Sequence, residues 1–128
     1  MSDKPHLLTI MELGGYPDFS GIYQAAGFEP LLERNMRKAL GVIKKKKPRV
    51  IVAEFNYQSD FRDRTSSLET LMAVVQRMPD TRVIVFYEQE QAVAYERVTS
   101  RFPVHASLTF PIDEDLLAQS LADLQEPV

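Results

Sequence analysis

Short apolar runs alternate along the chain with longer segments in which apolar residues recur every three or four positions. The clearest run covers residues 50–53 and ends at Glu54. A continuous apolar run of this kind indicates a strand buried on both faces, as parallel sheets require. Ligands of open α/β sheets bind beyond the carboxyl ends of the strands, so Glu54 lies where a functional group is expected.

Four more segments have the apolar content of strands, and amphipathic helical spacing fills the intervals between them. The segment 28–33 contains Pro30, which has no backbone N–H to donate, and is therefore expected at a sheet edge. The other strands are predicted at 6–11, 83–87 and 107–110, and helices at 18–26, 35–47, 66–75, 88–101 and 113–124.

The ends of the predicted helices carry recognisable signals. Asp18, Asn35 and Asp113 stand where N-caps are expected, and Ser66 opens a capping box. Gly27 is expected to end the first helix in the left-handed conformation. The helix at 88–101 has the weakest apolar pattern, so we expect it to be poorly anchored.

Strand and helix therefore alternate five times in order. This alternation predicts an α/β fold in which helices cover both faces of a doubly wound, five-stranded parallel sheet. The expected arrangement is flavodoxin-like, with the strand order 2-1-3-4-5 and the strand that ends at Glu54 in the centre. No internal repeat or linker interrupts the series, so residues 1–128 are expected to form a single domain.

Composition narrows the range of functions. The net charge of −3 and pI near 5.4 provide no basic field for nucleic acid or an anionic membrane. The absence of cysteine excludes disulfides, thiolate nucleophiles and thiolate metal sites. No apolar run approaches the ~18 residues that span a bilayer, and no signal peptide is evident, so we expect a cytoplasmic protein.

The chain resembles a bacterial response-regulator receiver domain of the CheY-like superfamily over essentially its whole length. The most specific part of the resemblance is 35–55. The matching residues are Ala26-Gly27-Phe28, Asn35, Ala39-Leu40, Lys47-Pro48, Val50-Ile51-Val52 and Phe110-Pro111.

The resemblance also shows which functional residues of the family are replaced. Glu54 stands at the phosphoaccepting aspartate, Glu12 and Leu13 at the acidic pair, Tyr87 at the hydroxyl residue, Phe110 at the lysine and Ser107 at the aromatic switch residue. Phosphoryl transfer to a carboxylate needs a divalent cation, a fixed cation and a hydroxyl group to hold the phosphate oxygens. The chain is therefore interpreted as a degenerate pseudo-receiver with no catalytic residue, metal or cofactor. Tyr87 and Phe110 are expected to fill the former phosphate pocket.

Several polar groups admit two interpretations. Glu54 is either a permanent mimic of the phosphorylated state or an ordinary acid at a strand end, and we favour the second. Glu12 and Glu54 can hold a cation together or be remnants of ancestry. The run Lys44–Lys47 suits either a nucleic-acid patch or a solvated helix end, and the helix dipole favours the second interpretation.

Two functional hypotheses follow. The first is a phosphorylation-independent, non-enzymatic signalling module that acts through protein–protein contact, with a partner from a two-component-type signalling system or as a homodimer. Its expected contact residues are Gln91, Tyr95, Arg97 and Arg101. The alternative is a small-ligand-binding or catalytic domain that uses the crevice at the carboxyl ends of the strands. Its candidate residues are Glu12, Asn56, Glu88, Tyr87 and Phe110.

Overall fold

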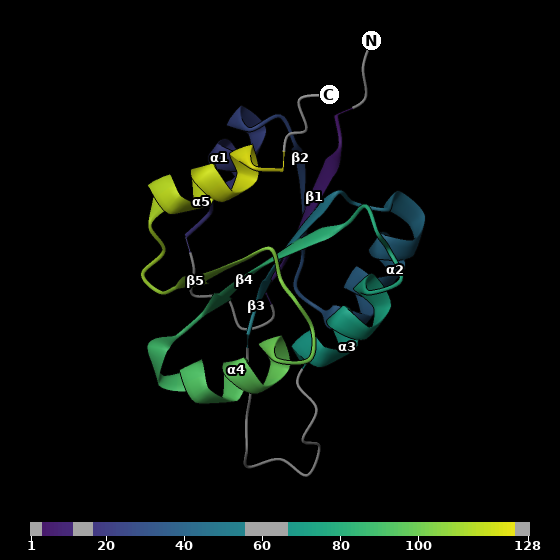
Figure 1. The fold of residues 1–128 in the computed structure, drawn as a ribbon. Coiled ribbons are helices and arrows are strands. Elements are labelled where there is room, and N and C mark those ends of the chain that lie inside the picture. Colours follow the sequence, from purple (N-terminus) through teal and green to yellow (C-terminus); the bar gives the residue numbers. More distant parts are fainter. Residues whose placement is uncertain (1–3, 12–16, 56–66, 125–128) are drawn as a thin grey trace.

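A computed structural model describes residues 4–11, 17–55 and 67–124. Five strands form one parallel sheet in the order β2-β1-β3-β4-β5 (Figure 1). They are β1 (His6–Ile10), β2 (Glu29–Glu33), β3 (Val50–Glu54), β4 (Arg82–Tyr87) and β5 (Ala106–Thr109). The predicted sheet and strand order are confirmed, including the edge position of the strand that contains Pro30.

Helices cover both faces of the sheet. In Figure 1, α1 (Ser20–Ala25) and α5 (Glu114–Ala122) lie together on one face. The opposite face carries α2 (Met36–Lys46), α3 (Ser67–Val75) and α4 (Ala92–Thr99), with the short 3₁₀ helix η1 (Gln89–Gln91) immediately before α4. None of the helices within the described ranges is long and apolar enough to cross a membrane.

The central strand explains the apolar run that stands out in the sequence. Val50 and Val52 pack in the core beneath α1 and α5, while Ile51 and Ala53 pack in the core beneath α2, α3 and α4. All four are buried because both faces of β3 are covered. Each strand residue therefore contributes to one of two cores, and no position in β3 before Glu54 is free to be polar.

The predicted helix ends are largely present. The Asn35 side chain accepts a hydrogen bond from the N–H of Lys38 at 3.1 Å, and Gly27 has a φ of 96°. The Asp113 carboxylate accepts hydrogen bonds from the N–H groups of Asp115 and Leu116 at 2.8 and 3.3 Å. Asp18 accepts from the N–H of Ser20 at 2.9 Å just before α1, and this bond lowers the pKa of its carboxyl group.

The predicted helix at 88–101 is too long at both ends. It starts as the 3₁₀ turn of η1, and α4 ends at Thr99. The N–H groups of Arg101 and Phe102 then both donate to the carbonyl of Val98, so the chain turns before Pro103. Proline disfavours helical geometry in the residue before it, which accounts for the early end. The capping box that opens at Ser66 lies outside the described residues.

Candidate functional site

The carboxyl ends of the parallel strands meet at one edge of the sheet, where a receiver domain would carry its phosphate site. Glu54 ends β3 and pairs in register with Phe86 of β4. It is partly buried. Glu12 and Leu13 lie outside the described residues, so their proximity to Glu54 stays a prediction. Across residues 4–11, 17–55 and 67–124, no group of three or more metal-ligating side chains is found.

Two aromatic replacements at this edge have different surroundings. Tyr87 ends β4, and its ring stacks on that of Tyr95 with the centroids 4.5 Å apart and the planes at 26°. Phe110 follows β5 and donates its N–H to the carbonyl of Tyr87 at 2.9 Å, but the residue is 44% exposed. The expectation that both rings fill a former phosphate pocket is wrong for Phe110, because a side chain so open to solvent does not close the edge.

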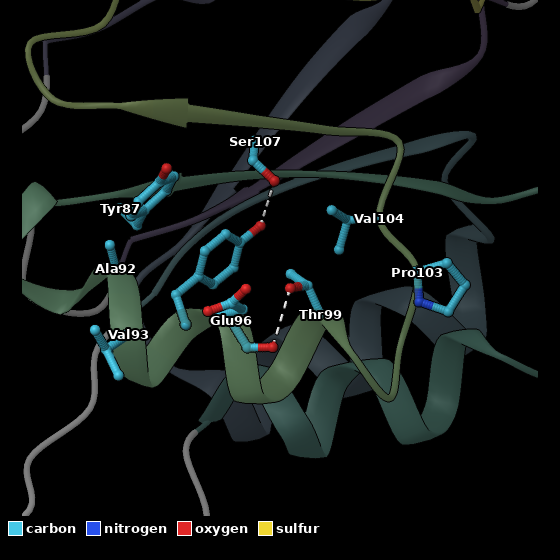
Figure 2. A pocket seen from close by; sticks show the side chains of 9 residues that line it. Tyr87, Ala92, Val93, Glu96, Thr99, Pro103, Val104 and Ser107 are labelled. Atoms are coloured by element: carbon cyan, nitrogen blue, oxygen red, sulfur yellow. Dashed lines mark hydrogen bonds between the residues drawn. The ribbon is translucent and has the colours of Figure 1, made fainter.

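Tyr95 connects α4 to the sheet. A hydrogen bond of 2.6 Å joins its hydroxyl to the Oγ of Ser107 on β5, as Figure 2 shows. The Phe55 ring lies 5.3 Å from the Tyr95 ring, centroid to centroid. Tyr95 is 5% exposed, and this burial raises the pKa of its phenol to about 12 even though the hydrogen bond with Ser107 acts in the opposite direction.

Tyr95 is therefore buried between α4 and the sheet, and its expected role as a contact residue stays a prediction. Ser107 is small and stands where receivers carry an aromatic side chain, so space is left on this face of β5. The Tyr95 ring, which projects from α4, fills that space, and its hydroxyl forms a hydrogen bond with the hydroxyl of Ser107. The helical pattern around Tyr95 did not predict this burial. The space that the Tyr95 ring occupies is left by Ser107 of β5, twelve residues further along the chain.

The other three expected contact residues also differ from one another. Arg97 is exposed, as expected. Arg101 forms a salt bridge of 3.2 Å with Glu69 of α3, and its guanidinium lies 5.4 Å from the centroid of the Phe102 ring. Gln91 is partly buried, and its Oε1 has no hydrogen-bond partner within the described part of the chain. Arg101 therefore links the end of α4 to α3.

A groove of about 560 Å³ runs between α4 and β5 (Figure 2). Val93, at 69% exposed, is the most exposed large apolar residue described and lies on its α4 side. The full lining is Tyr87, Ala92, Val93, Tyr95, Glu96, Thr99, Pro103, Val104 and Ser107. Most of this surface was not predicted from the sequence. Val93 could have indicated the groove from the sequence, because it is an apolar residue that lies off the core-facing stripe of its helix.

A second hollow of about 390 Å³ lies between β1, β2 and α1, lined by Thr9, Asp18, Tyr23 and Arg34 among others. Burial raises the pKa of Tyr23 well above its ordinary value. The alternative ligand-binding crevice was assigned to other residues. Of these, Glu12 and Asn56 lie outside the described residues, and Glu88 is exposed. That alternative stays a prediction.

The strand order and the helical crossovers are those of the flavodoxin-like fold, which response-regulator receiver domains also have. Solved structures agree. A receiver domain from Clostridium thermocellum superposes with a TM-score of 0.74 at 12% identity, covering 94% of this chain and 93% of that one. The chemotaxis response regulator CheY4 of Vibrio cholerae gives 0.71 at 18% identity, over 95% and 99%.

A sensor protein from Polaromonas sp. JS666 gives a TM-score of 0.70 at 20% identity, covering 95% of this chain and 96% of that one. The sequence matches no protein-family model and no curated protein. At such identities the likeness establishes the fold, and the role of the chain has to be argued from its own residues.

Proposed function

We propose that this protein is a phosphorylation-independent, receiver-like signalling module without enzymatic activity, which acts through protein–protein contact at the surface between α4 and β5. The observation that carries the proposal is the contact between Tyr95 and Ser107. In receivers, a hydroxyl residue at the end of the fourth strand and an aromatic residue on the fifth strand respond to the phosphate. Here Tyr87 and Ser107 stand at those positions, and both contact Tyr95.

The chemistry at the strand ends supports the loss of switching. Phe110 cannot donate a hydrogen bond to a phosphate oxygen from its side chain, whereas the lysine it replaces can. Glu54 carries one more methylene than aspartate, which displaces the attacking oxygen. A phosphoryl group needs both a fixed cation and a positioned nucleophile, so these changes together disfavour its transfer.

The groove supports the contact role. Val93 lines one end of the groove, and Pro103 and Val104 line the other end (Figure 2). Exposed apolar side chains on a small protein commonly mark an interaction site. The partner is either a protein of the same signalling system or a second copy of the chain.

Two measurements test the proposal. The first is an amide NMR titration with beryllofluoride and magnesium, in which we expect the Tyr95 and Ser107 resonances to stay in place. Shifts at those residues would show that the pocket still switches.

The second measurement is photo-crosslinking in expressing cells, with a photoreactive amino acid placed at Val93. The matched control is Leu32, which is 54% exposed on the opposite edge strand β2. We expect discrete protein adducts from position 93 and none from position 32. Equal labelling at both positions would remove the α4–β5 surface from consideration.

A further inference from the structure

The outer edge of β5 is suited to accept another strand. β5 is the last strand of the sheet, and Phe110, just after it, donates its N–H to the carbonyl of Tyr87 on β4 at 2.9 Å. Backbone groups of alternate residues point to the same side of a strand, so Ala106 and Leu108 also face β4. Ser107 and Thr109 consequently direct their N–H and C=O groups toward the outer edge.

The two edges of the sheet differ in their protection. The opposite edge strand, β2, contains Pro30, which lacks an N–H, and begins and ends with Glu29 and Glu33. Proline and charged residues on an edge strand oppose the addition of another strand. β5 has the sequence Ala-Ser-Leu-Thr, with neither proline nor charge. Its edge therefore lacks these protective features.

The groove lies beside this edge. A strand added to β5 would direct every second side chain toward α4, where Glu96, Thr99 and Val104 line the groove (Figure 2). The stretch of α4 from Ala92 to Thr99 is ~10 Å long at 1.5 Å per residue. Side chains two residues apart on a strand are separated by ~7 Å. The groove is thus long enough to receive two successive side chains of an extended segment.

Charge indicates what those side chains are. Glu96 lines the groove, and no lysine or arginine is among the described residues that form it. Glu88 and Glu90 precede α4 along the chain, and of the two arginines at 97 and 101, Arg101 is engaged with Glu69. An acidic surface of this kind favours a partner that carries positive charge.

We infer that the α4–β5 groove binds an extended peptide segment of a partner protein, which adds a strand to β5 and places a cationic side chain beside Glu96 and an apolar one beside Val104. The inference rests on the proposed function, because it names the partner chemistry for the same surface. Backbone hydrogen bonds to Ser107 and Thr109 supply affinity, and the groove supplies selectivity.

A second copy of the chain is the main competing occupant. Two β5 edges paired around a two-fold axis would bring this same acidic surface against itself, since such interfaces use one patch twice. Glu96 of α4 and Glu90 of η1 would then face like charges, which disfavours the association.

The probe is a fluorescent seven-residue peptide, with threonine at odd positions and valine, arginine and valine at positions two, four and six. Its binding to the full chain is followed by anisotropy. One control peptide carries glutamate instead of arginine. Two others are N-methylated at the odd or at the even positions. Only one of these two sets of amides can face β5, so each methylated peptide is the matched control for the other.

We expect the probe to bind, and one methylation pattern to weaken binding by at least about tenfold while the other leaves it nearly unchanged. We expect Glu96→Lys to bind the arginine peptide more weakly than the wild type does, and to bind the glutamate peptide more tightly. The control is Asp123→Lys, because Asp123 is an exposed acid beyond the end of α5. This variant should keep the wild-type preference for the arginine peptide over the glutamate peptide.

Three results would overturn the inference: no binding, binding that both methylated peptides retain, or binding that ignores charge. Self-association of the wild-type chain in sedimentation equilibrium, abolished by Val93→Glu, would identify the second copy as occupant. In each case the proposed function survives if crosslinks still form at position 93 and not at 32. It fails if those crosslinks are absent.

Discussion

The Tyr95 hydroxyl lies 2.6 Å from the Oγ of Ser107, and this bond joins the fourth helix to the edge strand of the sheet. The Tyr95 ring also stacks on Tyr87 and contacts Phe55, so one side chain from α4 meets three others, on or beside β3, β4 and β5. A helix with a sparse apolar stripe is thereby fixed to the sheet at Ser107, the position at which receiver domains carry an aromatic switch residue.

Removing either partner of that bond is expected to destabilise the fold by about 1 kcal/mol. Tyr95→Phe keeps the ring and its stacking but loses the hydroxyl, and Ser107→Ala removes the other oxygen. Since both single changes abolish the same interaction, the double variant should be hardly less stable than either one, with a coupling energy of about 1 kcal/mol. Urea unfolding of the four proteins measures it, and strictly additive losses would contradict a direct bond.

The phenol of Tyr95 also predicts a pH dependence. Its pKa is about 12 in the folded protein because of burial, against an ordinary value of 10. The unfolded chain therefore loses this proton first as the pH rises. The corresponding stabilisation is complete below pH 10 and disappears between pH 10 and 12.

The urea midpoint of the wild type should accordingly fall more between about pH 9 and 11 than that of Tyr95→Phe. Burial raises the pKa of Tyr23 in the same direction, so wild type and variant share that contribution and the difference isolates Tyr95. If the urea midpoints of the two proteins fell equally with pH, the folded structure would not raise the pKa of Tyr95.

The sequence was sufficient for the parts of the fold that depend on local pattern. The strand β3 is apolar up to Glu54 because both its faces are covered, and a polar side chain earlier in the strand would be buried at a cost in free energy. Asn35 and Asp113 cap their helices through contacts three or fewer residues away. Signals of this range are complete within a short window, so they can be interpreted without the tertiary structure.

The site could not be derived in the same way. Tyr95 is buried because Ser107 leaves space beside it, and the two residues belong to elements whose packing no local window contains. Phe110 is exposed although a former phosphate pocket is the natural place to expect it. Substitutions at known functional positions indicate what has been lost, but where the new side chains go depends on the neighbours that the fold brings to them.

The cap of the last helix offers a matched pair of acids. Asp113→Ala removes two hydrogen bonds at the N-terminus of α5 and is expected to cost about 1 kcal/mol of stability, whereas Asp113→Asn should cost little, since asparagine also caps. Asp123→Ala, at the other end of α5, removes an acid from the negative end of the helix dipole and should be neutral or slightly stabilising. Urea unfolding that ranks Asp123→Ala as the more damaging change would refute this account.

Lys47, which ends α2, provides the last prediction. It has φ 47° and ψ 62°, the left-handed conformation, while its N–H donates to the carbonyl of Ile43 at 3.0 Å. A side chain in this conformation costs roughly 1 kcal/mol, which glycine avoids. Lys47→Gly should therefore raise the free energy of unfolding, by about 0.5 kcal/mol after the greater freedom of glycine in the unfolded chain is subtracted.

The neighbouring residue supplies the control. Lys46 is the last residue within α2, so Lys46→Gly removes the same charge and side chain without relieving any left-handed strain. Glycine within a helix costs up to about 1 kcal/mol, so this variant should be less stable than the wild type. Thermal or urea unfolding at matched salt compares the two. Because both variants lose one lysine, opposite signs can only come from the backbone, and equal shifts would point to the charge.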